Sequence, residues 1–261
     1  MDDNPPNLIQ LVILCEGPTD SWVAQELADR VFRERGPDWV KDVGLDALRR
    51  WSGLEPNTTF TPWRSVKDLA GKTGIRYLGH PVGQPQKEDA AITRKAIHLA
   101  RRLRQSGKAS VDALILVRDV DKREGRIQGV AQAVDEENGK PEPLVIVVAF
   151  AVAMIEAWIL NGFAPRDATE ARILEALRAE LGFDPCLAAH RLDARSHGPP
   201  SRRSAKRVLH ELTGGDRDRQ RSCLQDTPLD HLESRGAESG LAPFLGHAHV
   251  KLTPVVVRGD C

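Results

Sequence analysis

The stretch LVILCEGPTD, residues 11–20, joins a run of aliphatic residues to two acidic residues across a Gly-Pro turn. Four aliphatic residues followed by Cys15 predict a strand that is covered on both faces. Glu16 comes directly after this strand, where a carboxylate is costly unless an arginine, a helix N-terminus or a metal ion lies beside it. Asp20 or Thr19 is predicted to cap the helix that follows.

The composition is that of an ordinary globular protein. Of the 261 residues, 41% are hydrophobic and 28% are charged, and the 37 basic residues balance the 37 acidic ones. Because the net charge is zero, any binding of a polyanion must come from local patches. The longest apolar run, PLVIVVAFAVAMIEAWIL, contains Glu156, so no run reaches the roughly 20 residues that cross a bilayer. The N-terminus is acidic where a signal peptide is basic, and we expect a cytoplasmic protein.

The cysteines show no zinc-site or redox spacing. They are predicted to be free thiols, and they are Cys15, Cys186, Cys223 and Cys261.

Strands and helices alternate along the first part of the chain. Continuous apolar runs predict strands at residues 8–15, 113–117 and 144–150. Helices are predicted at residues 20–35, 89–105, 126–134 and 153–161. Apolar strands that alternate with helices predict an α/β fold, in which a mostly parallel sheet is flanked by helices on both faces.

Two regions follow from this pattern. We expect residues 1–162 to form an α/β core with an irregular insertion at about 37–74, in which one short helix lies near residues 46–51. Residues 163–261 are expected to form a mostly helical C-terminal region. Within it, PVVVR at residues 254–258 is the strand-like run.

Acidic residues follow each predicted strand. Glu16 and Asp20 follow the first, Asp119 and Asp121 the second, and Glu156 the third. In an open parallel sheet the ligand crevice lies beyond the carboxyl ends of the strands, so these side chains are expected to converge. Unpaired carboxylates at short distance repel one another, and a hard cation such as Mg²⁺ removes that conflict.

Two of these motifs resemble those of a known domain. Glu-Gly-x-x-Asp at residues 16–20 and Asp-x-Asp at residues 119–121, each after a strand, resemble the TOPRIM domain. That domain occurs in topoisomerases, bacterial primases and the nucleases of the OLD (overcoming lysogenization defect) family. The stretch MIEAWIL at residues 154–160 is similar to a segment of small stand-alone TOPRIM-like proteins of uncharacterised or anti-phage function.

The resemblance is strongest over residues 8–20 and 110–162 and looser in the C-terminal third. There, SRRSAKRVL (201–209) and LAPFLGHAHVKL (241–252) resemble a Ser/Pro-x-Lys helix and a closing Pro-Phe segment of those proteins.

The resemblance implies a TOPRIM-like, Rossmann-like sheet and a nuclease that uses Mg²⁺ or Mn²⁺, in a site for two ions. It makes Glu16 a metal ligand or general base and gives Asp119 and Asp121 the binding of Mg²⁺. Asp20 and Glu156 would complete a second metal position. The family often has Glu where this chain has Asp20, and the shorter side chain reaches an ion only through water or serves as a helix cap.

Basic residues complete the expected site. The resemblance includes a lysine near the scissile phosphate, for which Lys206 is the first candidate and Lys251 the second. Lys206 lies among arginines that can bind a phosphate backbone without reading its sequence, namely Arg202, Arg203 and Arg207.

Each candidate also has a plain structural interpretation. Asp20 is as well placed for a cap as for a ligand. Asp119 can belong to a surface ion-pair cluster with Arg118, and Glu156 can pair with an arginine from a helix face. Trp158 is predicted to pack in the core.

Three functions remain open from the sequence. The first is a metal-dependent nuclease that cleaves DNA or RNA, as an anti-phage effector that works with a separate ATPase. The second is a phosphotransfer or glycosyl-transfer enzyme that holds a nucleotide–metal complex through its Asp-x-Asp motif. The third is a regulatory subunit of an ATPase complex, because LAGKTG (69–74) lacks the first glycine of a P-loop and this chain supplies no ATPase itself.

Overall fold

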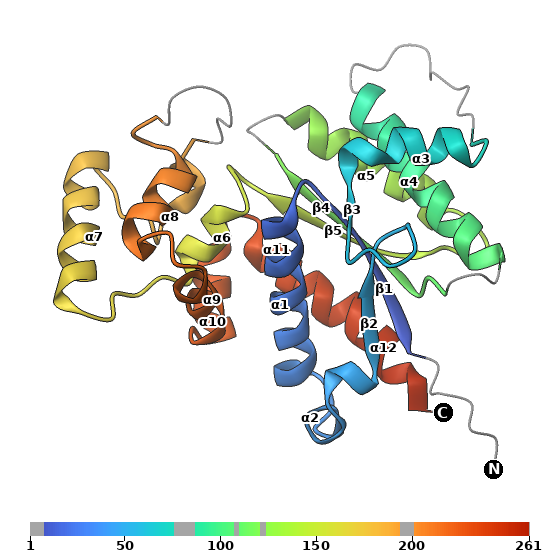
Figure 1. The fold of residues 1–261 in the computed structure, drawn as a ribbon, viewed down its shortest axis with the longest axis horizontal. Coiled ribbons are helices and arrows are strands. Elements are labelled where there is room, and N and C mark those ends of the chain that lie inside the picture. The colour runs from blue at the N-terminus through green and yellow to red at the C-terminus, as the bar shows by residue number, and fades with distance from the viewer. Residues whose placement is uncertain (1–7, 76–86, 107–109, 121–123, 194–200, 261) are drawn as a thin grey trace. The chain divides into compact units, whose positions relative to one another are not determined.

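The computed structural model describes residues 8–75, 87–106, 110–120, 124–193 and 201–260. Within these ranges, five strands form one parallel sheet in the order β2-β1-β4-β5, and β3 pairs with β1 beside β2 (Figure 1). The strands are β1 (Ile9–Cys15), β2 (Arg49–Ser52), β3 (Thr61–Pro62), β4 (Ala113–Asp119) and β5 (Val145–Ala151). This sheet confirms the predicted α/β class and is consistent with a Rossmann-like arrangement.

The chain divides into two compact units. The first comprises Met1–Val117, Arg123–Val148 and His247–Cys261, and the second comprises Arg118–Lys122 and Ala149–Gly246. This division differs from the expected boundary at residue 162, because the end of β5 belongs to the second unit and the segment from His247 onward belongs to the first.

Helices flank the sheet of the first unit. Figure 1 shows α3, α4 and α5 on one side of the strands and α1 with α12 on the other. The helices of this unit are α1 (Pro18–Arg35), α2 (Trp39–Val43), α3 (Val66–Lys72), α4 (Lys87–Ser106), α5 (Glu124–Asn138) and α12 (Thr253–Val256). The burial of both sheet faces explains why the central strands are apolar throughout.

The centre of the sheet is the pair β1 and β4. Leu11–Leu14 align with Ala113–Leu116 in parallel register, and each of these side chains is at most 2% exposed. At about 1.5–3 kcal/mol for each fully buried large aliphatic side chain, this pair is a main source of apolar stabilisation.

The expected insertion at residues 37–74 contributes two strands to the sheet. A 3-10 turn, η1 (Leu45–Ala47), leads into β2, so the predicted short helix is wrong over residues 49–51. β2 pairs with Ile9–Val12 and β3 pairs with Leu14–Cys15, so the two short strands pair with successive segments of β1.

An ion pair fixes β2 against α1. Arg49 of β2 donates to both carboxylate oxygens of Asp29, through Nε at 2.9 Å and Nη2 at 2.5 Å. The Trp51 indole N–H donates to the same carboxylate at 3.1 Å. The Arg49 and Asp29 side chains are 10% and 14% exposed, so this bidentate pair is shielded from water.

We predict that Asp29→Asn lowers the free energy of unfolding by about 3 kcal/mol, because it leaves the Arg49 charge buried without its partner. The measurement is the urea midpoint at an unchanged m-value. Asp46→Asn is the matched control, since Asp46 contacts the same arginine at 3.0 Å but is fully exposed, and it should leave the midpoint unchanged. Equal effects of the two substitutions would contradict the role given to the buried pair.

The second unit is built of helices around α6. Its helices are α6 (Glu156–Asn161), α7 (Ala168–Leu181), α8 (Ala205–Thr213), α9 (Arg217–Gln225), α10 (Leu229–Gly236) and α11 (Leu241–His247), of which the last ends in the first unit. All six residues of α6 are buried. Trp158 is 0% exposed and stacks on Phe244 at 5.2 Å, so its predicted packing role is confirmed.

A buried polar network ties α6 to the rest of this unit. The Asn161 amide donates to the carbonyl oxygens of Cys186 and Arg235 at 3.0 and 3.1 Å and accepts from the Ser239 hydroxyl at 2.7 Å. Each side-chain atom of this buried amide therefore has a partner, as a buried polar group requires.

The strand-like run PVVVR is helical. Thr253–Val256 form α12, which follows the π-helical turn η4 (Ala248–Leu252). Val255 and Val256 are buried, α12 and η4 both contact α1, and Pro254 lies in the first turn of α12. A proline is tolerated there because the first N–H groups of a helix have no intrahelical acceptor. The β-branched composition is therefore overridden by packing against α1.

Candidate acidic site in the second unit

Asp119 fixes the turn that carries Glu156. Asp119 is the last residue of β4 and is 5% exposed, and its Oδ1 accepts a hydrogen bond from the Ile155 N–H at 3.1 Å. Within the same turn, Ala153 has φ of +70°, a left-handed conformation that is strained for a residue with a Cβ. The turn from β5 into α6 is thus held in a costly conformation beside a buried carboxylate.

Glu156, the first residue of α6, is 8% exposed, and its Oε1 lies 3.8 Å from the Lys206 ammonium. Its Oε2 is buried and has no hydrogen-bond partner among the residues that the structure describes. Burial raises the pKa of the Glu156 carboxyl, and the charge of Lys206 opposes this effect. A carboxylate oxygen in this position is available to a cation or a proton.

Lys206 reaches Glu156 from the first turn of α8. The Ser204 hydroxyl caps this helix by accepting from the Arg207 N–H at 3.5 Å. The Lys206 side chain is 56% exposed, so its ammonium can move toward solvent or a bound anion. The second lysine candidate, Lys251, lies in η4 of the first unit and donates to the Ile146 carbonyl at 3.3 Å.

Asp20 lies in the first turn of α1 in the first unit. The helix starts at Pro18, two or three residues earlier than a cap at Thr19 or Asp20 requires, and Gly17 is the N-cap. The Asp20 Oδ2 accepts from the Gly17 N–H at 2.8 Å. Asp20 therefore caps from inside the helix rather than before it, which agrees with its plain structural interpretation.

Glu16 lies within reach of an arginine. Its carboxylate is 3.8 Å from the Arg126 guanidinium, which also lies 4.0 Å from Asp89 of α4. The Arg126 side chain is 15% exposed and that of Glu16 is 38% exposed. Sequence reasoning did not identify Arg126 or Asp89, although Arg126 follows the Asp-x-Asp motif at the start of the next helix, where a charge partner for strand-end acids can be expected.

The predicted acids are distributed over both units. The second unit brings together Asp119 and Glu156, whereas Glu16 and Asp20 belong to the first, and Asp121 lies outside the described residues. Within the described part of the chain, no group of three or more His, Cys, Asp or Glu residues is arranged to hold a metal ion. Two carboxylates, those of Asp119 and Glu156, still match in kind the donors of Mg²⁺, which commonly uses one or two carboxylates and keeps several waters.

The three predicted nucleic-acid contacts differ in their surroundings. Arg207 forms salt bridges with Glu180 at 2.8 Å and with Glu211 at 2.6 Å. Arg202 and Arg203 are exposed and form no ion pair with a described residue.

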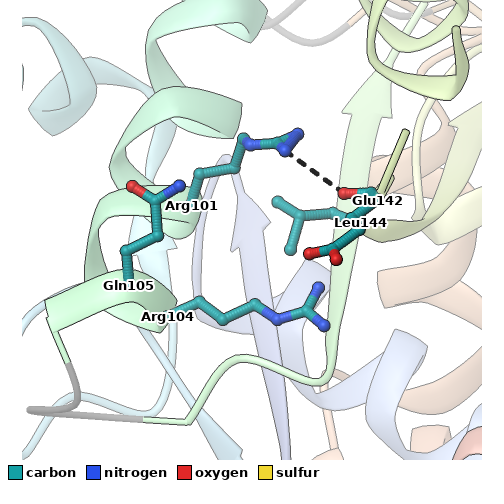
Figure 2. A pocket seen from close by; sticks show the side chains of 5 residues that line it. All are labelled: Arg101, Arg104, Gln105, Glu142 and Leu144. Atoms are coloured by element: carbon teal, nitrogen blue, oxygen red, sulfur yellow. Dashed lines mark hydrogen bonds between the residues drawn. The ribbon is translucent and has the colours of Figure 1, made fainter. Parts of the chain in front are cut away.

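A shallow pocket lies elsewhere in the first unit, at the end of α4 and the start of β5 (Figure 2). It measures about 250 Å³, and Figure 2 shows the Arg101 guanidinium directed at the Glu142 carbonyl oxygen, 3.2 Å away. The lining residues are Arg101, Arg104, Gln105, Glu142 and Leu144. Leu144 precedes β5, so the pocket is at the amino ends of the strands, opposite the edge where open α/β sheets bind ligands.

No family model, curated protein or solved structure matches this chain. The TOPRIM resemblance therefore stays a prediction from the sequence motifs. None of the described helices is both long and apolar enough to cross a membrane.

We predict that Glu156→Gln makes the protein more stable than the wild type at mildly alkaline pH. Because the Glu156 pKa is raised, the folded state holds this proton more tightly than the unfolded chain, and stability falls as pH rises from the unfolded pKa through the folded one. Glutamine removes the buried charge, and the expected gain is about 1 kcal/mol, the scale of an unsatisfied buried group.

Thermal unfolding over a pH series measures this effect, and the gain should vanish at acid pH, where both states are protonated. Glu238→Gln, an exposed residue of the same unit, is the control and should show no such dependence. A Glu156→Gln variant that is less stable than the wild type at alkaline pH would show that the carboxylate has a stabilising partner.

Proposed function

We propose that this chain is a Mg²⁺- or Mn²⁺-dependent phosphodiesterase of the TOPRIM type that acts on nucleic acid. The observation that carries the proposal is the Glu156 carboxylate, which is buried with a partnerless Oε2 in the described structure, 3.8 Å from Lys206. Such an arrangement destabilises the fold, and residues that do so cluster at functional sites.

The neighbouring residues have complementary roles in this proposal. Asp119 and Glu156 would hold a divalent ion, which when bound polarises a phosphate oxygen and activates water. The hydrogen bond from the Ile155 N–H orients Asp119, and the same bond sets the start of the helix that carries Glu156. In the absence of substrate, the Lys206 ammonium partly neutralises the Glu156 carboxylate. When nucleic acid binds, this ammonium would instead pair with the scissile phosphate.

The fold supports the same assignment. In parallel α/β sheets, ligands bind beyond the carboxyl ends of the strands, next to the point where the strand order reverses. Here β1 has β2 on one side and β4 on the other, so the reversal lies between β1 and β4. Asp119, which ends β4, belongs to the second unit together with Glu156. The TOPRIM resemblance makes Glu16 of the first unit a ligand or general base, and its carboxylate is 38% exposed.

We predict that purified protein cleaves DNA or RNA when Mg²⁺ or Mn²⁺ is present, and that Glu156→Gln and Lys206→Ala each reduce the rate by about 100-fold or more. The measurement is the cleavage of labelled single-stranded DNA, duplex DNA and RNA, with and without EDTA. Glu238→Gln and Arg217→Ala are matched controls on exposed residues of the same unit and should cleave at the wild-type rate.

Circular dichroism of every variant separates a loss of chemistry from a loss of folding. Cleavage that survives both substitutions, or that proceeds equally well in EDTA, would refute the proposed site.

The resemblance also implies a separate ATPase as partner in phage defence. We predict that an ATPase encoded beside this chain co-purifies with it from the native host and increases the cleavage rate. Affinity purification followed by mass spectrometry measures the association. A purified pair in which neither protein changes the activity of the other would contradict this partnership.

A further inference from the structure

Two arginines lie on one aromatic ring of the second unit. The Phe183 ring has the Arg191 guanidinium carbon 4.3 Å from its centroid and that of Arg203 at 5.8 Å. Phe183 is 9% exposed, whereas both arginines are exposed. Cation–π contacts of this kind hold guanidinium groups in place while their N–H donors still face solvent.

These arginines form no ion pair with another residue that the structure describes. Arg191, Arg202 and Arg203 have no salt-bridge partner among the described residues, and we call these three the arginine face. Two other arginines of the second unit are paired, since Arg178 lies 2.5 Å from Asp184 and Arg219 lies 2.8 Å from Glu170.

The acids near the arginine face are already engaged. Asp184 and Glu180 pair with Arg178 and Arg207, and the Asp193 carboxylate accepts a hydrogen bond from the Ser201 hydroxyl at 3.0 Å. The arginine face therefore keeps exposed guanidinium N–H donors, in a chain whose net charge is zero and whose binding of a polyanion must come from local patches.

The arginine face is close in sequence to the candidate acidic site. Arg202 and Arg203 precede α8, and Lys206 in the first turn of that helix lies 3.8 Å from Glu156. Arg203, on the Phe183 ring, is thus three residues before Lys206 in the chain.

We infer that the arginine face binds the phosphate backbone of a nucleic acid strand and leads it to Glu156. The identity of the ligand rests on the proposed function, and Arg191 is a binding residue that the sequence motifs did not indicate. Several separate cations on an open surface fit a chain of phosphates better than one small anion. Contacts to phosphate alone make the binding independent of base sequence.

The test is the affinity for a fluorescent oligonucleotide in EDTA, measured by anisotropy over a series of salt concentrations. Arg191→Ala with Arg203→Ala should weaken binding about tenfold or more and reduce the slope of log K against log salt by about 1.5, the loss expected for two phosphate contacts. Arg217→Ala, which removes an exposed arginine at the start of α9, is the matched control and should leave both quantities unchanged.

Binding and cleavage are separated by the same assay. Glu156→Gln should bind like the wild type, because it leaves the arginine face intact. A wild-type protein that binds through the arginine face but cleaves nothing in Mg²⁺ or Mn²⁺ would refute the phosphodiesterase and leave this inference standing. The inference is overturned if the double variant keeps the wild-type affinity and slope, or if tripolyphosphate competes as strongly as the oligonucleotide at equal phosphate concentration.

Discussion

The pairing of β1 with β4 is the constraint on which the rest of the structure depends. Their central residues are buried on both faces, so no position along these strands tolerates a charge without a partner. Charged side chains are therefore displaced to the strand ends. Glu16 follows β1 and Asp119 ends β4 for this reason, and the same burial requirement that shapes the core also locates the acids that can carry chemistry.

Electrostatic pairing distinguishes structural from candidate functional charges. Buried structural charges make close, bidentate contacts, as in Arg49 with Asp29 and Arg219 with Glu170. Glu156 differs, because it is equally buried but has only a lysine at 3.8 Å and one oxygen without a partner in the described residues. Among the buried side-chain atoms of the described residues, this oxygen stands out for lacking a hydrogen-bond partner, and a local departure of this kind is typical of a site kept for a ligand.

The sequence predicted the features that depend on local pattern. Continuous aliphatic runs identified β1, β4 and β5, and helical periodicity identified α4. Strand β2 was missed because it begins with two arginines, and Arg49 becomes acceptable in the sheet only through Asp29, a residue of the preceding helix. Glu156 was identified as a site residue from its position after a strand.

The burial of Glu156 and its pairing with Lys206 depend on two helices whose paired residues are 50 positions apart in the chain, so no local sequence pattern indicates them. Arg191 was missed for the same reason, since only its contact with the Phe183 ring distinguishes it from other exposed arginines.

Because the second unit is inserted within the first in the chain, the order of synthesis has a consequence for folding. Residues 247–260 complete the first unit by packing η4 and α12 against α1, yet they leave the ribosome after the whole helical unit. During translation, α1 therefore exposes the apolar surface that these residues later cover, and such transiently exposed surface is prone to aggregation.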